Sequence, residues 1–458
     1  MTQSSDENYI PQYRPMINGI LIENYLKLVM AFLSSKSQMQ YFRKSGKKIG
    51  MISLPWGREF IFASKAVPIH FPRVGNFESH PILKALNLGK SFGWTNLMNV
   101  VRSLKYLTGD KFYIKLIYDF VHAIFWNYDR YIKIGEESGI FPLDSCFGTR
   151  MLYGNIVDNS ANIDFNLGLG TRCNWFSKYF EIIEDFPKPG NKGKVPLLLL
   201  EIPNTFDDNG FNTLKENINQ LLGNLEKITG NTITNNDLYK SAVISNSIKK
   251  YFKKLMIMWS GNNIKLPPLA YTNLFALLHI AFTDYLGDDK FFADTLKNLI
   301  TELKSPYKQS YDVSNVPKIA LINHFGGYEP ELPYIIDELG GRLIIPDWHS
   351  LGLLEDTKTT GDMIDNFTQD ILHVSFCWCN NLIMSKNWVD TVDKLNVDGV
   401  IFNATYGCKS LTPALKLFQD KLKELDRPIP ATFINFQNIG DNLGQTKTRV
   451  GALIEMIK

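Results

Sequence analysis

Short runs of apolar and β-branched residues alternate along this chain with segments in which apolar residues recur every three or four positions. The runs are typical of buried strands, and the periodic segments are typical of helices. The predicted strands are 48–54, 67–71, 163–169, 194–202, 319–322, 343–346, 398–403 and 432–436. The predicted helices are 22–32, 59–65, 175–184, 214–228, 269–286, 291–303, 331–339, 412–425 and 444–456. Gly230 is expected to end the helix 214–228, and Thr234-Asn235-Asn236-Asp237 to begin another. This order of strands and helices predicts an α/β fold with parallel sheets.

The same pattern divides the chain into four parts. Residues 1–45 read as an N-terminal helical extension, and 46–230 as a first α/β domain with a helical, aromatic-rich insertion at 76–140. Residues 231–310 read as a helical connector, and 311–458 as a second α/β domain. No short-period repeat is present, although the two α/β units could be related folds.

Composition narrows the class of protein. With 45% hydrophobic and 13% aromatic residues, 458 residues can bury large cores in two or three domains. Lysine and arginine number 49 against 46 aspartates and glutamates, so nothing favours a nucleic-acid or acidic-membrane partner. No apolar run approaches the roughly 18 residues of a membrane span, and the polar, acidic residues 1–15 are unlike a secretory signal. Five cysteines make no disulfide framework, so we expect a reduced, cytoplasmic protein.

Three of the five cysteines have similar local settings. Cys408 follows a buried strand and precedes a helix, Cys173 lies at another strand-to-helix junction, and Cys146 precedes a predicted helix. Open α/β sheets bind ligands at the carboxyl ends of their strands, and a helix N-terminus favours a thiolate. A lone buried cysteine is more often a small core residue. Three thiolates together would suit a shared iron–sulfur or zinc site with one metal position open to substrate, although spacing alone does not favour such a site over three structural cysteines.

Other motifs carry weaker signals. Gly168-Leu169-Gly170 lacks the third glycine and the acidic residue of a dinucleotide site, and no GxxxxGK[ST] motif is present, so the chain itself should not hydrolyse ATP. The seven histidines show no zinc-site spacing. His324-Phe325-Gly326-Gly327 faintly resembles the oxyanion loop of a lipase, but the GxSxG motif of the lipase nucleophile is absent from the sequence. Cys377-Trp378-Cys379 lacks the CxxC spacing, so we interpret it as structural.

Several motifs occur in one characteristic order. They are Ile49-Gly50, Glu59, 66–69, Asp144-Ser145-Cys146, Cys173-Asn174-Trp175, 200–203, the run 398–411, and Gln445, Thr448, Arg449 and Glu455 in the last helix. Together they resemble the cluster-bearing, component-D-type subunits of the 2-hydroxyacyl-CoA dehydratase and benzoyl-CoA reductase family. The resemblance covers most of residues 47–458.

The resemblance implies two flavodoxin-like α/β domains with a [4Fe–4S] cluster between them, held by Cys146, Cys173 and Cys408. It implies an enzyme subunit for the reductive ketyl-radical dehydration of a 2-hydroxyacyl-CoA, in which one electron passes to the thioester carbonyl. The electron would come from a separate ATP-hydrolysing activator, and the partner would be a paralogous cluster-bearing subunit or a second copy. Backbone amides after Cys173 and Cys408 would offset the negative charge of the cluster.

Alternatives stay open beside this interpretation. The chain could serve a benzoyl-CoA-type ring reductase or another small-molecule cluster reductase, or act as a non-catalytic electron-relay or scaffold subunit. Gly57 stands where the family usually has proline, and Arg73 follows Pro72 where substrate-binding subunits often carry an acid. The arginine favours an electron-relaying subunit or a different substrate. The acyl group, the CoA-binding residues and the fourth iron ligand, for which Cys379 is an unsupported candidate, are left open.

Overall fold

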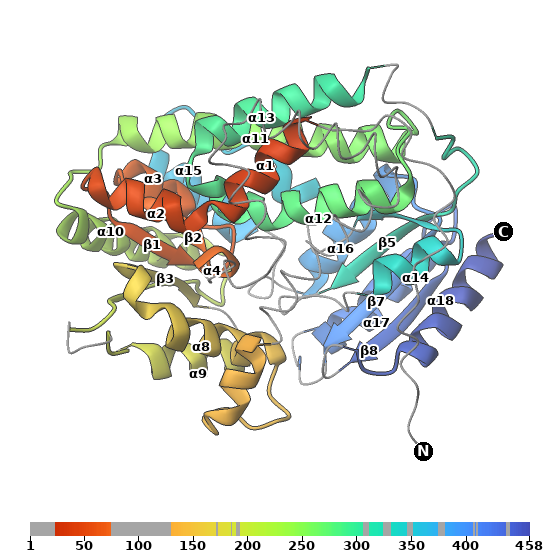
Figure 1. Ribbon diagram of the computed structural model, residues 1–458, viewed down its shortest axis with the longest axis horizontal. Coiled ribbons are helices and arrows are strands. Elements are labelled where there is room, and N and C mark those ends of the chain that lie inside the picture. Colours follow the sequence, from red (N-terminus) through yellow and green to blue (C-terminus); the bar gives the residue numbers. More distant parts are fainter. Residues whose placement is uncertain are drawn as a thin grey trace, which may run out of the picture.

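Two sheets of four parallel strands lie side by side in the described part of the chain, surrounded by helices (Figure 1). The computed structural model describes residues 23–74, 130–170, 173–184, 186–188, 193–305, 311–323, 331–345, 351–373, 381–405, 408, 411–436 and 440–458. The first sheet contains β1 (Ile49–Ile52), β2 (Val67–His70), β3 (Phe165–Gly170) and β4 (Leu197–Glu201) in the order β2-β1-β3-β4. The second contains β5 (Lys318–Asn323), β6 (Arg342–Ile345), β7 (Gly399–Thr405) and β8 (Ala431–Phe436) in the order β6-β5-β7-β8. The predicted α/β, flavodoxin-like architecture is confirmed.

The direction in which strands are added reverses at equivalent positions in the two sheets, between β1 and β3 in the first and between β5 and β7 in the second. The chain enters an inner strand, adds the edge strand on one side, and crosses back to place β3 beside β1 and β7 beside β5. At these switch points Ile52 pairs with Leu167, and Asn323 pairs with Asn403. Ligands of open α/β sheets bind outside the carboxyl ends of the strands at such points. The carboxyl ends of β1 and β3 in the first sheet, and of β5 and β7 in the second, are therefore candidate positions for a ligand-binding site.

Capping residues define where several of the helices begin and end. They are α1 (Glu23–Leu33), α2 (Ser35–Lys44), α3 (Arg58–Ala63), α4 (Phe71–Val74), α8 (Phe147–Asn159), α9 (Asn174–Ile183), α10 (Asp208–Thr229), α11 (Asn235–Ser260), α12 (Pro268–Asp284), α13 (Asp289–Leu303), α14 (Leu332–Glu338), α15 (Met363–His373), α16 (Asn381–Lys394), α17 (Leu411–Lys423) and α18 (Leu443–Ile457). Gly230 ends α10 in the left-handed conformation, with φ at 72°. Thr234 and Asp237 form a capping box that begins α11.

The helices of residues 235–303 pack on both sheets. Helix α12 contacts β2 of the first sheet and β6 of the second. At the end of α11, the indole of Trp259 donates a hydrogen bond to the carbonyl of Leu343 at 2.5 Å. The largest core cluster contains residues of both sheets. The two units therefore share one apolar core, while the division into four parts proposed from the pattern stays a prediction.

Helix α15 crosses from one unit to the other. It lies between β6 and β7 in the sequence, yet it packs against α10 and α11 of the first unit. The ring of Phe367 meets that of Phe60 on α3 edge-on, with centroids 5.0 Å apart. The sequence pattern did not predict α2, α15 or α16. Of the helical insertion expected at 76–140, residues 130–137 are helical, and residues 76–129 lie outside the described residues.

No helix in the described residues is long and apolar enough to cross a membrane.

Candidate functional site

The three cysteines singled out in the sequence lie where the strands of both sheets end. Cys173 follows β3 and is the N-cap of α9, while Cys408 follows β7. Cys146 is the N-cap of α8. The ring of the next residue, Phe147, lies 5.5 Å from that of Phe436, the last residue of β8. The start of α8 therefore reaches the carboxyl edge of the second sheet, although its own cysteine belongs to the first unit.

The electrostatics of the thiols show that the three lie close to one another. Burial is the largest of the effects that raise the pKa of Cys146 to about 12, and the charges of Cys408 and Cys173 act in the same direction. The backbone amides of Gly148 and Thr149 act in the opposite direction. Three sequence-distant thiols are thus within electrostatic reach, with Cys146 only 5% exposed and the other two half-buried.

One expectation about these thiols needs correction. The sequence predicted that helix N-termini would favour thiolates, and the amides of Phe176 and Trp175 do lower the pKa of Cys173. Burial is the larger effect, so the net pKa of Cys173 is raised, as it is at Cys146. Desolvation outweighs the helix terminus because a buried thiolate loses its hydration. A bound positive charge would therefore favour the thiolate forms of Cys146 and Cys173.

Among the described residues, no three His, Cys, Asp or Glu side chains converge as ligands of a metal ion. Cys377 and Cys379 lie outside the described residues, as does the segment 324–327.

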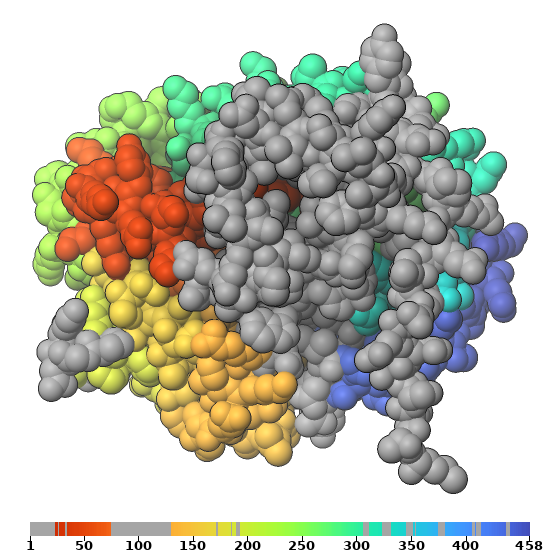
Figure 2. Space-filling view, viewed as in Figure 1, coloured from red at the N-terminus to blue at the C-terminus, as the bar shows by residue number. Residues whose placement is uncertain are grey.

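The loop that leads to Cys146 reaches the surface. Ile140 and Leu143 are 44% and 63% exposed, whereas Phe141 between them is buried. The segment that begins at residue 130, orange in Figure 2, forms a lobe at the lower edge of the face shown. The innermost of the three thiols therefore lies only a few residues from exposed apolar side chains.

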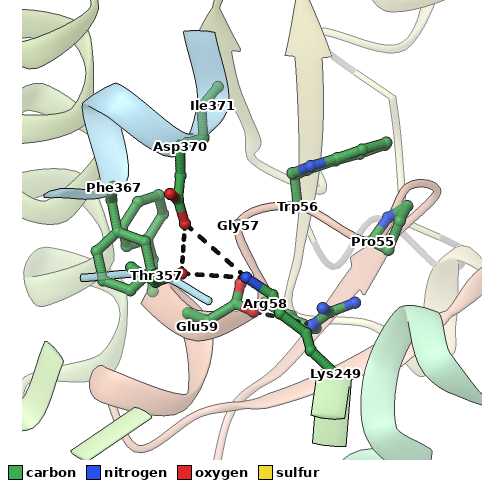
Figure 3. Close-up of a pocket in the computed structure, with 11 residues that line it drawn as sticks. Pro55, Trp56, Gly57, Arg58, Glu59, Lys249, Thr357, Phe367, Asp370 and Ile371 are labelled. Carbon is green, nitrogen blue, oxygen red and sulfur yellow. Dashed lines mark hydrogen bonds and ion pairs between the residues drawn. The ribbon is translucent and has the colours of Figure 1, made fainter. Parts of the chain in front are cut away.

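A second polar cluster lies beyond the carboxyl end of β1, around a cavity of about 30 Å³. Residues 55–60, Lys249, Thr357, Phe367, Asp370 and Ile371 line it. The side chains of Lys249, Thr357 and Asp370 point toward one another (Figure 3). The Lys249 ammonium donates to the Thr357 hydroxyl at 3.1 Å and lies 3.8 Å from the Asp370 carboxylate. This volume accommodates one or two water molecules.

Burial is the largest influence on the ionisation of Lys249 and Asp370 in this cluster. It lowers the pKa of Lys249, against the attraction of Asp370 and Glu59. It also raises the pKa of Asp370, against the attraction of Lys249. At Glu59 burial is outweighed by the charges of Arg58 and Lys249 and by the Ser245 hydroxyl, so its pKa is lowered.

Sequence reasoning missed this cluster, although one signal was present. Ser245, Lys249 and Phe252 follow the buried stripe of α11 at helical spacing, so a lysine occupies a core position of an amphipathic helix. A buried lysine needs a carboxylate or carbonyl partner, and here the partners come from residues 355–370. No local pattern identifies those residues.

Arg73, which departs from the family pattern, has a structural role. It makes a buried ion pair with Asp284, and its second terminal nitrogen donates to the Gln38 side chain at 2.7 Å. The backbone amide of His70 donates to the same Asp284 carboxylate at 2.7 Å. The ion pair of Arg73 thus links β2 and α4 to the end of α12. Because residue 73 is an arginine, it supplies no carboxylate to a substrate.

Comparison with known families agrees with this geometry. The family model described as 2-hydroxyglutaryl-CoA dehydratase, D-component, matches residues 114–457, about three quarters of the chain. The match includes all three cysteines and the whole second sheet. No curated protein matches the chain. The chain belongs to the family of the 2-hydroxyglutaryl-CoA dehydratase D-component.

Proposed function

We propose that this chain is the iron–sulfur subunit of an enzyme that dehydrates a 2-hydroxyacyl-CoA, with Cys146, Cys173 and Cys408 as ligands of a [4Fe–4S] cluster. The observation that carries the proposal is that Cys173 and Cys408, which follow strands of different parallel sheets, lie within electrostatic reach of the buried Cys146. Membership of the D-component family supports the dehydratase class.

The residues present fit such a cluster. Soft thiolates are the ligands that iron–sulfur clusters take, and three of them leave one iron position for another ligand. Burial disfavours ionisation of the Cys146 and Cys173 thiols by raising their pKa, and bound iron would supply the positive charge that stabilises the thiolates. When bound, the cluster would supply single electrons of low potential to a thioester substrate.

The protein's own contribution is to hold these ligands and to exclude water. Cys146 is buried, and the next residue, Phe147, packs on Phe436 at the end of β8, so the site has an apolar wall on the side of the second sheet. A dry wall strengthens electrostatic interactions and limits side reactions of a reactive substrate. The backbone amides of Gly148 and Thr149 face the Cys146 sulfur and would offset part of the negative charge there.

The proposal includes partners. A separate ATP-hydrolysing activator would deliver the electrons, because the chain has no nucleotide-binding loop of the GxxxxGK[ST] type. A paralogous cluster-bearing subunit, or a second copy of this chain, would complete the enzyme. Family membership is what supports both partners.

The first test is metal content. Iron and acid-labile sulfide are measured on anaerobically purified protein and on Cys146→Ser, Cys173→Ser and Cys408→Ser. We expect about four irons and four sulfides per chain, with a large loss in each variant. Cys377→Ser is the matched control and should retain the cluster. A folded wild-type protein without iron would overturn the proposal.

The second test is activity. The cluster-loaded protein is combined with an activator, ATP, a reductant and candidate partner subunits, and 2-hydroxyacyl-CoA thioesters are supplied. We expect the corresponding 2-enoyl-CoA, detected by mass spectrometry, and no product with Cys408→Ser. Reduction of an aromatic acyl-CoA in place of dehydration would reassign the subunit to the ring reductases.

A further inference from the structure

A buried hydroxyl without a partner lies directly beside the innermost thiol. Ser145 precedes Cys146 and is 1% exposed. Its backbone amide donates to the carbonyl of Pro142 at 2.9 Å, but its hydroxyl has no hydrogen-bond partner within the described structure. A buried polar group left unpaired destabilises the fold, because it loses its hydrogen bonds to water and gains none in the protein. Such a group in a native protein calls for an explanation, and an unseen ligand is one.

Unpaired donors recur one helical turn further on. Arg150 is also 1% exposed, and one terminal nitrogen, Nη1, pairs with the Glu136 carboxylate. Its Nε and Nη2 are buried and have no partner in the described structure. A helical side chain leans toward the N-terminus of its helix and covers the preceding turn. For Arg150 that turn begins at Cys146.

The unpaired atoms at these two positions share one chemical property, because each can donate a hydrogen bond. Arginine donates only, and a serine hydroxyl donates to an anion. The neighbouring hydroxyl of Thr149, in contrast, already donates to the carbonyl of Cys146 at 2.7 Å. The segment 145–150 thus presents spare donors beside three thiols and offers no spare carboxylate. Its natural complement is an anionic acceptor.

We propose that the side chains of Ser145 and Arg150 donate hydrogen bonds to the sulfur atoms of the cluster bound at Cys146 and thereby raise its reduction potential. This inference rests on the proposed function, because it needs the cluster. Hydrogen bonds to cluster sulfurs stabilise the reduced form, which carries one more negative charge. The two residues are positioning residues: they set how readily the cluster accepts an electron.

The test is a redox titration of the cluster, followed by electron paramagnetic resonance. Ser145→Thr and Ser145→Val have side chains of nearly the same shape and differ in the hydroxyl. We expect Thr to keep the wild-type potential. We expect Val to disfavour the reduced form by roughly tenfold, a shift of about 59 mV to more negative potential for one electron. Arg150→Lys, which removes the guanidinium fork but keeps the charge, should shift the potential in the same direction.

Two controls address the loss of a buried group. Ser64→Ala removes a buried hydroxyl that already donates to the Ile61 carbonyl at 2.7 Å, so it should lower stability and leave the potential unchanged. Arg130→Lys alters a more exposed arginine that pairs with Asp158 at 2.8 Å and should also leave it unchanged.

The outcomes separate this inference from the proposed function. Wild-type protein without iron and sulfide overturns the proposed function. A cluster with the same potential in Ser145→Thr and Ser145→Val overturns the role of Ser145, whatever the activity. If Ser145→Val does not retain a cluster, the comparison moves to Arg150→Lys, where an unchanged potential overturns the role of Arg150.

Discussion

Cys146 illustrates how burial and function compete at one residue. A helix N-terminus lowers the pKa of a thiol, but this thiol is almost wholly removed from water, and two further thiols lie near it. Without a bound metal the protonated form is therefore strongly favoured. We therefore expect this cysteine to react slowly with alkylating agents in the cluster-free protein.

Alkylation of the cluster-free protein tests this at the residue scale. With a pKa of about 12, only roughly one Cys146 in ten thousand is a thiolate at pH 8, and the thiolate is the reactive form. We expect iodoacetamide to label Cys146 at least a hundredfold more slowly than a small thiol in the same solution, as followed by peptide mass spectrometry. Labelling at equal rates would show that burial does not control this thiol.

Gly57 offers a second residue-scale prediction. Its φ is +84°, and an added Cβ would lie 2.7 Å from the Leu167 side chain. Gly57→Ala should therefore lower the free energy of unfolding by about 2–4 kcal/mol, from backbone strain and overpacking together. Gly230→Ala is the matched control, because its φ is +72° but no atom lies within 4 Å of the added Cβ. Urea unfolding should show a loss of only about 1 kcal/mol for that control.

At the scale of elements, α15 connects the two units. Its Phe367 packs on α3, Lys215 of α10 pairs with its Asp365 at 2.5 Å, and its Asp370 faces Lys249 of α11. The apolar contact stabilises the helix, whereas Lys249 and Asp370 both lose hydration there. Buried ion pairs often contribute little net stability, although removing one partner is costly.

A double-mutant cycle measures this balance. Lys249→Met leaves the Asp370 and Glu59 carboxylates without their ammonium, so we expect a loss of about 3 kcal/mol in the free energy of unfolding. Asp370→Asn in the same chain should recover part of this loss, because it removes one of the uncompensated charges. Lys253→Met, one turn further along α11 and paired with the exposed Glu355, should cost less than about 1 kcal/mol. Equal losses for the two lysine variants would contradict the assignment of Lys249 to a buried network.

At the scale of the whole molecule, the core shared by both sheets has a consequence for acid stability. His279 is buried in it against the rings of Phe252 and Phe275. Burial lowers its pKa from 6.5 to about 3. In the unfolded chain His279 therefore binds a proton near pH 6.5, whereas in the folded protein it stays neutral down to about pH 3. This residue stabilises the fold above pH 6.5, and its contribution is lost progressively as the pH falls.

The comparison of wild type with His279→Phe tests this linkage. The variant has no proton to bind at this position, so the wild type should lose about 1.4 kcal/mol more per pH unit than the variant below pH 6. Urea titrations at pH 7, 6, 5 and 4 measure the difference. Parallel pH profiles for the two proteins would show that His279 is protonated within the fold. Other buried groups contribute equally to both proteins, so the difference isolates this histidine.

Local interactions explain the part of the structure that could be read from the chain. The apolar run 400–402 became β7, Gly230 ended α10, and Thr234 began α11, because strand burial, a left-handed cap and a capping box involve residues only a few positions apart. The same local order predicted two α/β units. The motifs also identified Cys146, Cys173 and Cys408 as candidates, although their role as ligands stays a proposal.

Tertiary packing decided the rest. Only the fold brings Cys408 and Cys173 within electrostatic reach of Cys146, makes burial outweigh the helix N-termini, and carries α15 across to the first unit. The partners of Lys249 and the unpaired donors of Ser145 and Arg150 likewise depend on which distant surfaces exclude water. Desolvation is a property of the assembled core, and no periodicity or spacing along a chain encodes which polar groups it will enclose.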